Sequence, residues 1–198
     1  METTLKELLT KYEIENNLSH SEAAKSFGVH LATYYRWLNG ESTKLKRTTI
    51  EKLSELLDYD IEALLERQSR IKPVIGRVKA GYDFYAEENI EDYIELGQAD
   101  AQRGDYFLRV EGDSMEGSHI YDGDLVFVEQ CNIVSNGQIA IVVIGDEATI
   151  KKIYFKSNLL ILEASNPKYE TKYFTQQEVE ELQIKIIGLV RFVRHDFC

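Results

Sequence analysis

A change in hydrophobic spacing near residue 70 is the feature that most constrains how this chain folds. Before it, apolar residues recur three and four positions apart, as in the series Leu5, Leu8, Leu9 and Tyr12, which is the spacing of an amphipathic helix. After Arg70 the apolar residues alternate or run together in short segments between turn residues, which is typical of β-strands. This change of spacing therefore predicts a two-domain α plus β protein, with an all-α unit followed by a mostly-β unit.

The N-terminal part contains two short helices between longer amphipathic stretches, the second of which starts at Thr48. Ser19 or Ser21 is expected to cap the first short helix, because a serine side chain can accept a hydrogen bond from a free N–H there. Gly28 permits a tight turn, and residues 31–38 form the next helix, which Asn39-Gly40 ends. Two short helices joined in this way predict a helix-turn-helix.

Short apolar runs predict the strands of the C-terminal part, and pairs such as Asn136-Gly137 and Ser157-Asn158 separate them. Pro73 indicates an extended connector before the first run. We expect a helix-turn-helix unit over residues 1–68, a linker over 69–82 and a β unit over 83–198. The predicted strands are residues 106–110, 125–128, 138–144, 149–155, 159–163 and 184–193.

Composition narrows the class of protein. Of the 198 residues, 43% are hydrophobic and 29% are charged, as in ordinary globular proteins. Cys131 and Cys198 are far apart, so neither a disulfide framework nor a cysteine-rich zinc site is indicated. The apolar run at 139–144 is too short to cross a bilayer, and the histidines lack metal-ligand spacing. We expect a cytoplasmic protein without metal or cofactor and without a membrane partner.

The net charge of −11 argues at first against a nucleic-acid partner. The charge is unevenly divided, however. Residues 1–70 hold 10 basic and 12 acidic residues, whereas residues 71–198 hold 13 and 22. A basic surface on the N-terminal part would therefore be local, and Lys44 and Lys46 follow directly on the second short helix.

The helix-turn-helix resembles that of phage and Xre-type repressors. The resemblance implies that the second helix reads operator DNA, with Tyr34 and Trp37 facing the core and Arg36 contacting guanine or phosphate. A small protein-binding helical bundle is the alternative. The residues that match are Ala24, Gly28, Val29 and Tyr34-Tyr35-Arg36-Trp37-Leu38-Asn39-Gly40, and the groove-facing residues by alignment are His30, Leu31, Ala32, Thr33, Tyr35 and Arg36.

A serine in the loop Gly112-Asp113-Ser114-Met115 and a lysine on a later predicted strand, Lys151, form a candidate serine-lysine dyad. A neutral lysine amine can take the proton from a serine hydroxyl during nucleophilic attack. Neighbouring residues on a strand face opposite sides, so only one of Lys151 and Lys152 can reach Ser114. With Lys151 facing the serine, Thr149, Ile153 and Phe155 share its face, and these mostly apolar neighbours favour an uncharged amine.

The C-terminal part resembles the LexA family of self-cleaving repressors over nearly all of residues 73–198. The resemblance implies Ser114 as the nucleophile, Lys151 as the general base and Ala80-Gly81 as the bond that is cut. It also implies backbone N–H groups of Ser114 and Met115 as the oxyanion hole. The blocks that carry it are Gly76-Arg77-Val78-Lys79-Ala80-Gly81, Val110-Glu111-Gly112-Asp113-Ser114-Met115, Tyr121-Asp122-Gly123-Asp124-Leu125, Asn136-Gly137-Gln138 and Glu147-Ala148-Thr149-Ile150-Lys151-Lys152.

The family further implies a homodimer formed by the C-terminal part, with residues 184–193 as the pairing strand, and self-cleavage stimulated by RecA filaments on single-stranded DNA. Two alternatives stay open. One is a non-cleaving prophage repressor whose LexA-like part only dimerises and binds an antirepressor. The other is a peptidase that acts on other proteins. His119, five residues after Ser114, is expected to make local contacts only.

Overall fold

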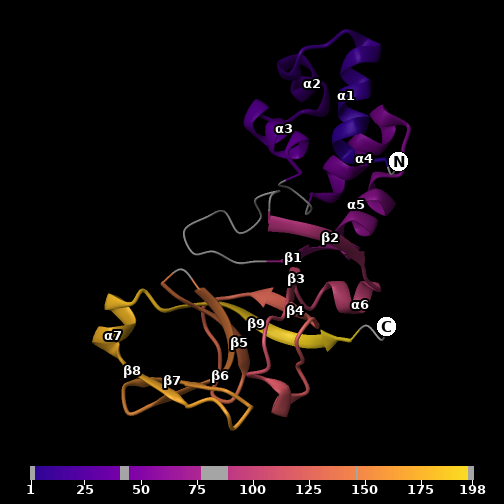
Figure 1. Cartoon of the computed structure of the whole chain (residues 1–198). Helices are drawn as coiled ribbons and strands as arrows, with labels where there is room; N and C mark the ends of the chain where they lie inside the picture. The colour runs from indigo at the N-terminus through magenta and orange to yellow at the C-terminus, as the bar shows by residue number, and fades with distance from the viewer. Residues whose placement is uncertain (1–2, 41–44, 77–88, 146, 196–198) are drawn as a thin grey trace. The chain divides into compact units, whose positions relative to one another are not determined.

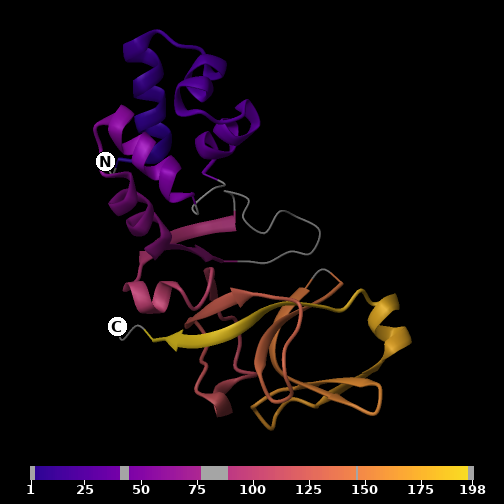
Figure 2. The ribbon, with the colours of Figure 1, turned by 180° about the vertical axis from the view of Figure 1, so that it is seen from behind.

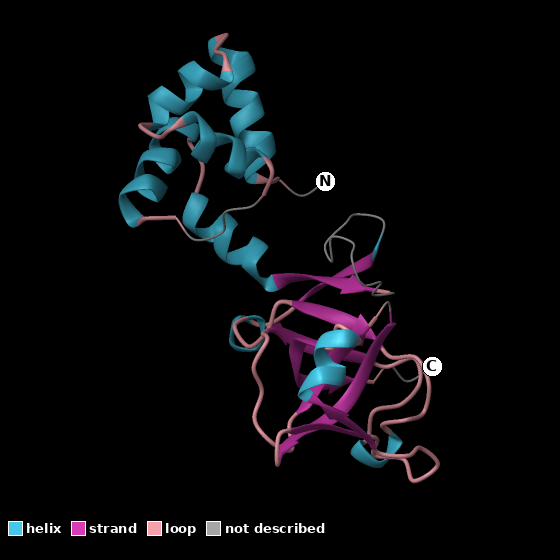
Figure 3. Cartoon of the chain, turned by 90° about the vertical axis from the view of Figure 1, so that its left-hand side faces the viewer, coloured by secondary structure: helices cyan, strands magenta, loops and turns pink. Residues whose placement is uncertain are grey.

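The computed structural model describes residues 3–40, 45–76, 89–145 and 147–195. The chain divides into two compact units, residues 1–70 and 71–198. Figure 3 shows that the described part of the first unit is helical, whereas the second unit consists mainly of strands with a few short helices. The expected fold class, an all-α unit followed by a mostly-β unit, is confirmed.

The described residues of the first unit form five helices, and both Figure 1 and Figure 2 show them packed together. Ser19 is the residue that caps α2, and it shares a reciprocal capping box with Glu22. Gly28 has a φ of 73°, the left-handed conformation that the turn after α2 requires. The helices are α1 (Leu5–Asn16), α2 (His20–Phe27), α3 (Leu31–Leu38), α4 (Arg47–Leu57) and α5 (Ile61–Arg70).

The core of this unit is aromatic at its centre. Tyr34 and Trp37 are 0% and 2% exposed, as predicted, and the ring of Tyr34 stacks on Phe27 with the centroids 6.0 Å apart. Leu9 of α1, Leu53 of α4 and Ile61 of α5 are also fully buried around them. Helix α3 is thereby fixed by one face, and its opposite face is left exposed.

The described strands of the second unit form a nine-stranded sheet in the order β2-β1-β3-β4-β9-β5-β6-β7-β8, and Figure 1 shows that it curls strongly. Among the described strands, only β1 and β3 pair in parallel. The sequence predicted β3 to β7 and β9 but missed β1, β2 and β8. The elements are β1 (Ile71–Ile75), β2 (Ile90–Glu95), α6 (Gln98–Ala101), β3 (Tyr106–Arg109), η2 (Glu116–Ser118), β4 (Leu125–Gln130), β5 (Ile139–Ile144), β6 (Glu147–Lys156), β7 (Leu159–Glu163), β8 (Lys172–Thr175), α7 (Gln176–Glu181) and β9 (Lys185–Arg194).

The beginning of the expected linker, 69–82, has regular structure instead. Helix α5 continues to Arg70, and β1 follows at once with Pro73 inside it. Proline lacks the N–H that a central strand position needs, but β1 pairs with β3 only through Val74 and Ile75. The sheet therefore accommodates Pro73, and the boundary between the two units falls at residues 70 and 71.

Strand β9 lies inside the sheet, where Val193 pairs with Val126 of β4 and Leu189 pairs with Ala140 of β5. Its backbone is therefore occupied on both sides by strands of the same chain.

No helix among the described residues is long and apolar enough to span a bilayer.

Candidate active site and DNA-facing helix

Ser114 lies in the loop that follows β3. Gly112 has a φ of 87°, a left-handed conformation, and its N–H donates to Asp122 Oδ1 over 2.6 Å. On the other side of the serine, Met115 is 2% exposed in the hydrophobic core and precedes the short helix η2. A hydrogen-bonded glycine turn on one side and a buried methionine on the other hold Ser114 at the surface of the β unit.

The structure brings Lys151 of β6 to this loop. Its Nζ lies 2.8 Å from Ser114 Oγ, although the two residues are 37 positions apart. The same nitrogen lies 3.0 Å from Thr149 Oγ1 and 2.9 Å from the Ile150 carbonyl oxygen. Lys152 is paired with Ile139 and Glu163 and takes no part in these contacts.

The pKa of the Lys151 amine is lowered, first by burial and then by the positive charge of Lys172. The prediction that apolar side chains surround Lys151 is wrong for Ile153 and Phe155. Ile153 is buried in another cluster and Phe155 is 48% exposed. Residues 151 and 155 are about 13 Å apart along a strand that rises about 3.3 Å per residue, so a shared face does not give them shared surroundings.

Ser114 and Lys151 line a pocket of about 540 Å³. Much of its wall comes from residues 168–172, a segment that sequence reasoning missed, although the pair Asn166-Pro167 before it is a turn signal. Its other lining residues are Glu111, Gly112, Asp113, Ser114, Thr149 and Lys151.

Asp113, next to the serine, binds this segment. Its carboxylate accepts hydrogen bonds from the Tyr169 hydroxyl and, over 3.1 Å, from Lys168 Nζ. Both contacts hold the pKa of Asp113 below its ordinary value, and the Asp113 carboxylate raises the pKa of Lys168 in turn. Asp113 and Lys168 therefore remain an ion pair at neutral pH.

In the first unit, the described residues that were predicted to face DNA are exposed or half-buried. His30, Tyr35 and Arg36 are exposed at α3, Thr33 is half-buried, and Lys46 is exposed at the start of α4. Lys44 lies outside the described residues, as do Ala80 and Gly81.

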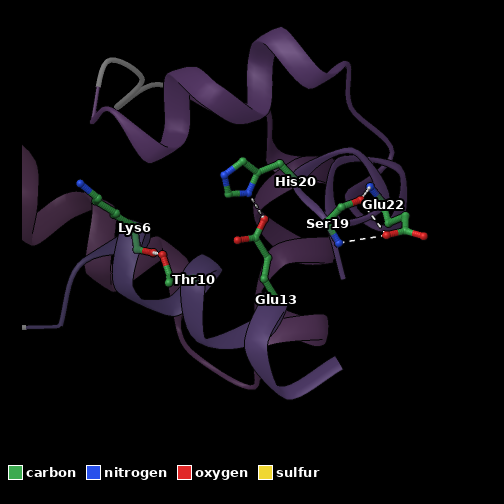
Figure 4. A network of polar contacts seen from close by, with 6 residues as sticks. All are labelled: Lys6, Thr10, Glu13, Ser19, His20 and Glu22. Atoms are coloured by element: carbon green, nitrogen blue, oxygen red, sulfur yellow. Dashed lines mark hydrogen bonds and ion pairs between the residues drawn. The ribbon is translucent and has the colours of Figure 1, made fainter. Parts of the chain in front are cut away.

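A polar contact behind α3 connects three helices. Glu13 of α1 is only 8% exposed, and its Oε1 lies 2.5 Å from His20 Nδ1 of α2. Figure 4 shows the two side chains pointing toward one another, with a dashed line for this contact. The ring of His20 meets the Tyr35 ring of α3 edge-on, with centroids 5.4 Å apart. His20 therefore contacts both Glu13 of α1 and Tyr35 of α3, and so connects these two helices to α2.

The remaining histidines of the second unit make contacts of their own. His119 is exposed and its Nδ1 lies 3.4 Å from the Tyr121 hydroxyl, which is a local contact as predicted. His195 Nδ1 lies 2.9 Å from Asp124 Oδ1. Within the described ranges, no three His, Cys, Asp or Glu side chains are grouped so as to hold a metal ion.

Both units of the chain match families of known proteins. Residues 6–64 match the Helix-turn-helix family model and residues 73–191 match the Peptidase S24-like model. The LexA repressor of Leptospira interrogans serogroup Icterohaemorrhagiae serovar copenhageni (strain Fiocruz L1-130) is 35% identical over 175 residues, covering 86% of this chain and 85% of the relative. The LexA repressor of Desulfitobacterium hafniense (strain DSM 10664 / DCB-2) is 39% identical, with 70% and 67% covered.

A solved structure of Fe(II)-HppE with an alternative substrate covers 96% of this chain and 93% of its own, with 11% identity and a TM-score of 0.27. A likeness that weak carries no argument about this fold. The two family models, by contrast, define a DNA-binding protein with a peptidase-type second domain. The chain belongs to the LexA family of repressors.

Proposed function

We propose that this repressor inactivates itself by cutting the Ala80-Gly81 bond, with Ser114 as the nucleophile and Lys151 as the general base. The observation that supports this most directly is the 2.8 Å contact between Lys151 Nζ and Ser114 Oγ. General-base catalysis needs a proton acceptor within hydrogen-bond reach of the nucleophile. The lowered pKa of Lys151 adds to the argument, because only the neutral amine can accept a proton.

The surroundings of Lys151 also suit a directed base. A neutral amine has two N–H donors and one lone pair. Thr149 Oγ1 and the Ile150 carbonyl oxygen can each accept one N–H, and the lone pair then points at the remaining neighbour, Ser114 Oγ. The two acceptors on β6 therefore orient the base as well as hold it.

In the proposed reaction, Ser114 Oγ bonds to the Ala80 carbonyl carbon while its proton passes to Lys151 Nζ. The carbonyl oxygen becomes an oxyanion, which the N–H groups of Ser114 and Met115 stabilise. The carbon–nitrogen bond then breaks, and the Lys151 ammonium returns the proton to the Gly81 amine. Water, deprotonated by Lys151, hydrolyses the acyl-serine in a second round of the same steps.

The cut would separate the unit that reads DNA from the unit that pairs the chains. We propose that the second unit forms a homodimer, which places two copies of α3 on a twofold-related operator. Because β9 has strands on both sides, pairing would use side chains and not the addition of a strand at β9. A RecA filament on single-stranded DNA is the proposed stimulus, by analogy with the family, and it is expected to promote docking of the linker.

Purified full-length protein, incubated from pH 7 to about 10, tests the proposal. We expect two fragments, residues 1–80 and 81–198, whose masses identify the cut, at a rate that rises with pH. Ser114→Ala and Lys151→Ala are each expected to abolish the reaction, and Lys152→Ala serves as the matched control that still cleaves.

An uncut chain at every pH, with or without RecA filaments, would contradict self-cleavage. That result would favour the non-cleaving repressor that only dimerises and binds an antirepressor. Cleavage that persists in Ser114→Ala under protease-free conditions would exclude the proposed nucleophile.

A further inference from the structure

We propose that Asn166 aims the two N–H groups of the oxyanion hole, those of Ser114 and Met115, an inference that rests on the proposed self-cleavage. Asn166 is a positioning residue in this account, since it acts on the backbone beside the nucleophile and touches no reacting atom. It lies in the turn between β7 and β8, 53 positions after Asp113.

Asn166 holds two successive carbonyl groups of the serine loop. Its side-chain Nδ2 donates to the Asp113 carbonyl oxygen over 2.9 Å. Its backbone N–H donates to the Ser114 carbonyl oxygen over 3.1 Å, and the N–H of Ser165 reaches the same oxygen over 2.9 Å. Both carbonyl groups therefore point toward Asn166.

Because the peptide bond is planar, the direction of each carbonyl group fixes the direction of the N–H group in the same peptide. No cis peptide bond occurs among the described residues. In a trans peptide the C=O of one residue and the N–H of the next point in opposite directions. Because the carbonyls of Asp113 and Ser114 point toward Asn166, the N–H groups of Ser114 and Met115 point away from it, side by side.

Both N–H groups, those of Ser114 and Met115, lack a protein acceptor among the described residues. Two fixed, unpaired N–H groups beside a serine oxygen are what stabilisation of an oxyanion requires.

Asn166 is itself fixed in orientation. It is only 5% exposed, and its Nδ2 makes a second contact of 3.1 Å, with Asp113 Oδ2. Its Oδ1 accepts from the backbone N–H of Lys168 over 3.1 Å. The amide cannot be flipped, because the Lys168 N–H can only donate and the Asp113 carbonyl can only accept.

The two loops also meet backbone to backbone. A Cβ atom on Gly117 would lie 1.9 Å from the Ser165 carbonyl oxygen, so a side chain there would push the loops apart. Ser118 Oγ lies 2.6 Å from Ser165 Oγ at the same contact. Asn166 therefore acts within a close-packed contact and not at the tip of a free loop.

The test compares Asn166→Ala with Lys168→Gln in the full-length protein. Both variants remove a contact with Asp113, but only the first removes a side-chain hydrogen bond to its carbonyl oxygen, which then keeps only the 3.3 Å contact with the Glu116 N–H. We expect the cleavage rate of Asn166→Ala at its alkaline plateau to fall by about 10- to 1,000-fold. The upper end of this range corresponds to the complete loss of one oxyanion-hole donor. The pH at half-maximal rate should stay unchanged, because Lys151 keeps its surroundings. Lys168→Gln removes only a contact with the Asp113 side chain, so its rate should fall less than that of Asn166→Ala.

A second measurement is independent of cleavage. At neutral pH, the amide NMR signals of Ser114 and Met115 in the uncut chain should shift or broaden in Asn166→Ala and not in Lys168→Gln. If Asn166→Ala unfolds the second unit, the near-isosteric Asn166→Asp replaces it, since it also lacks the Nδ2 donor.

The outcomes separate the two claims. A parent protein that never cleaves contradicts the proposed function, and the amide signals alone then decide the role of Asn166. Unchanged Ser114 and Met115 signals in a folded variant overturn the inference, as does cleavage at the parent plateau rate. A reduced plateau with an unchanged midpoint and altered amide signals supports it.

Discussion

Thr149 Oγ1 lies 3.0 Å from Lys151 Nζ, on the same face of β6 and two residues before it. Thr149→Val keeps the shape of the side chain and removes this acceptor. The lone pair of the neutral amine is then less well directed at Ser114, so we expect self-cleavage to slow by about two- to tenfold, as for the loss of one hydrogen bond. Thr171→Val, in the same pocket, is the control. Equal rates for the two variants would contradict the orienting role of Thr149.

The second prediction concerns pH and Lys172. Burial and then the positive charge of Lys172 lower the pKa of Lys151. Removing that charge in Lys172→Gln should raise the pKa of Lys151, so that less of the amine is neutral at a given pH. The profile of cleavage rate against pH should therefore move to higher pH, with the same plateau.

Lys168→Gln is the matched control for Lys172→Gln, because Asp113 already balances the charge of Lys168 at 3.1 Å. Rates measured at closely spaced pH values give the two midpoints. A midpoint that stays in place, or moves to lower pH, would show that Lys172 does not act on Lys151.

The third prediction concerns DNA binding through Arg36, which is exposed on α3. Arg36→Ala should weaken operator binding by about 1–3 kcal/mol if the side chain contacts a base. If it contacts a phosphate, the loss should be similar for all sequences and the salt dependence should become shallower. Gel shifts at several salt concentrations measure both, and Lys11→Ala on α1 is the control. Unaltered binding by Arg36→Ala would remove Arg36 from the interface.

The fourth prediction concerns the pair Glu13 and His20, whose side chains lie 2.5 Å apart beneath α3. His20→Ala leaves the buried Glu13 carboxylate without this partner, so we expect the free energy of unfolding of the first unit to fall by about 1–3 kcal/mol. Urea unfolding measures it. The exposed pair of Lys11 and Glu15, at 3.6 Å, is the comparison, and Lys11→Ala should cost less than about 0.5 kcal/mol. A loss for His20→Ala as small as for Lys11→Ala would refute the structural role of the buried pair.

Several of these features were evident in the sequence alone because they depend on neighbours along the chain. A cap at Ser19 or Ser21 and the Gly28 turn follow from local hydrogen bonding and backbone conformation, whereas the burial of Tyr34 and Trp37 follows from the resemblance to repressor helix-turn-helix motifs. The positions of most strands along the chain followed from apolar runs between turn residues, and the candidate dyad followed from the family pattern around Ser114 and Lys151.

Contacts between distant segments were decided only by the tertiary structure. Strands β2 and β8 have no buried residues and so lack a strong apolar pattern. The polar setting of Lys151 depends on how β6 meets the serine loop, and the Lys172 charge reaches it from β8. Asn166 meets Asp113 from 53 positions away. Periodicity reports which residues are buried, but it carries no information on which buried polar group meets which, because the folding of the sheet sets those pairs.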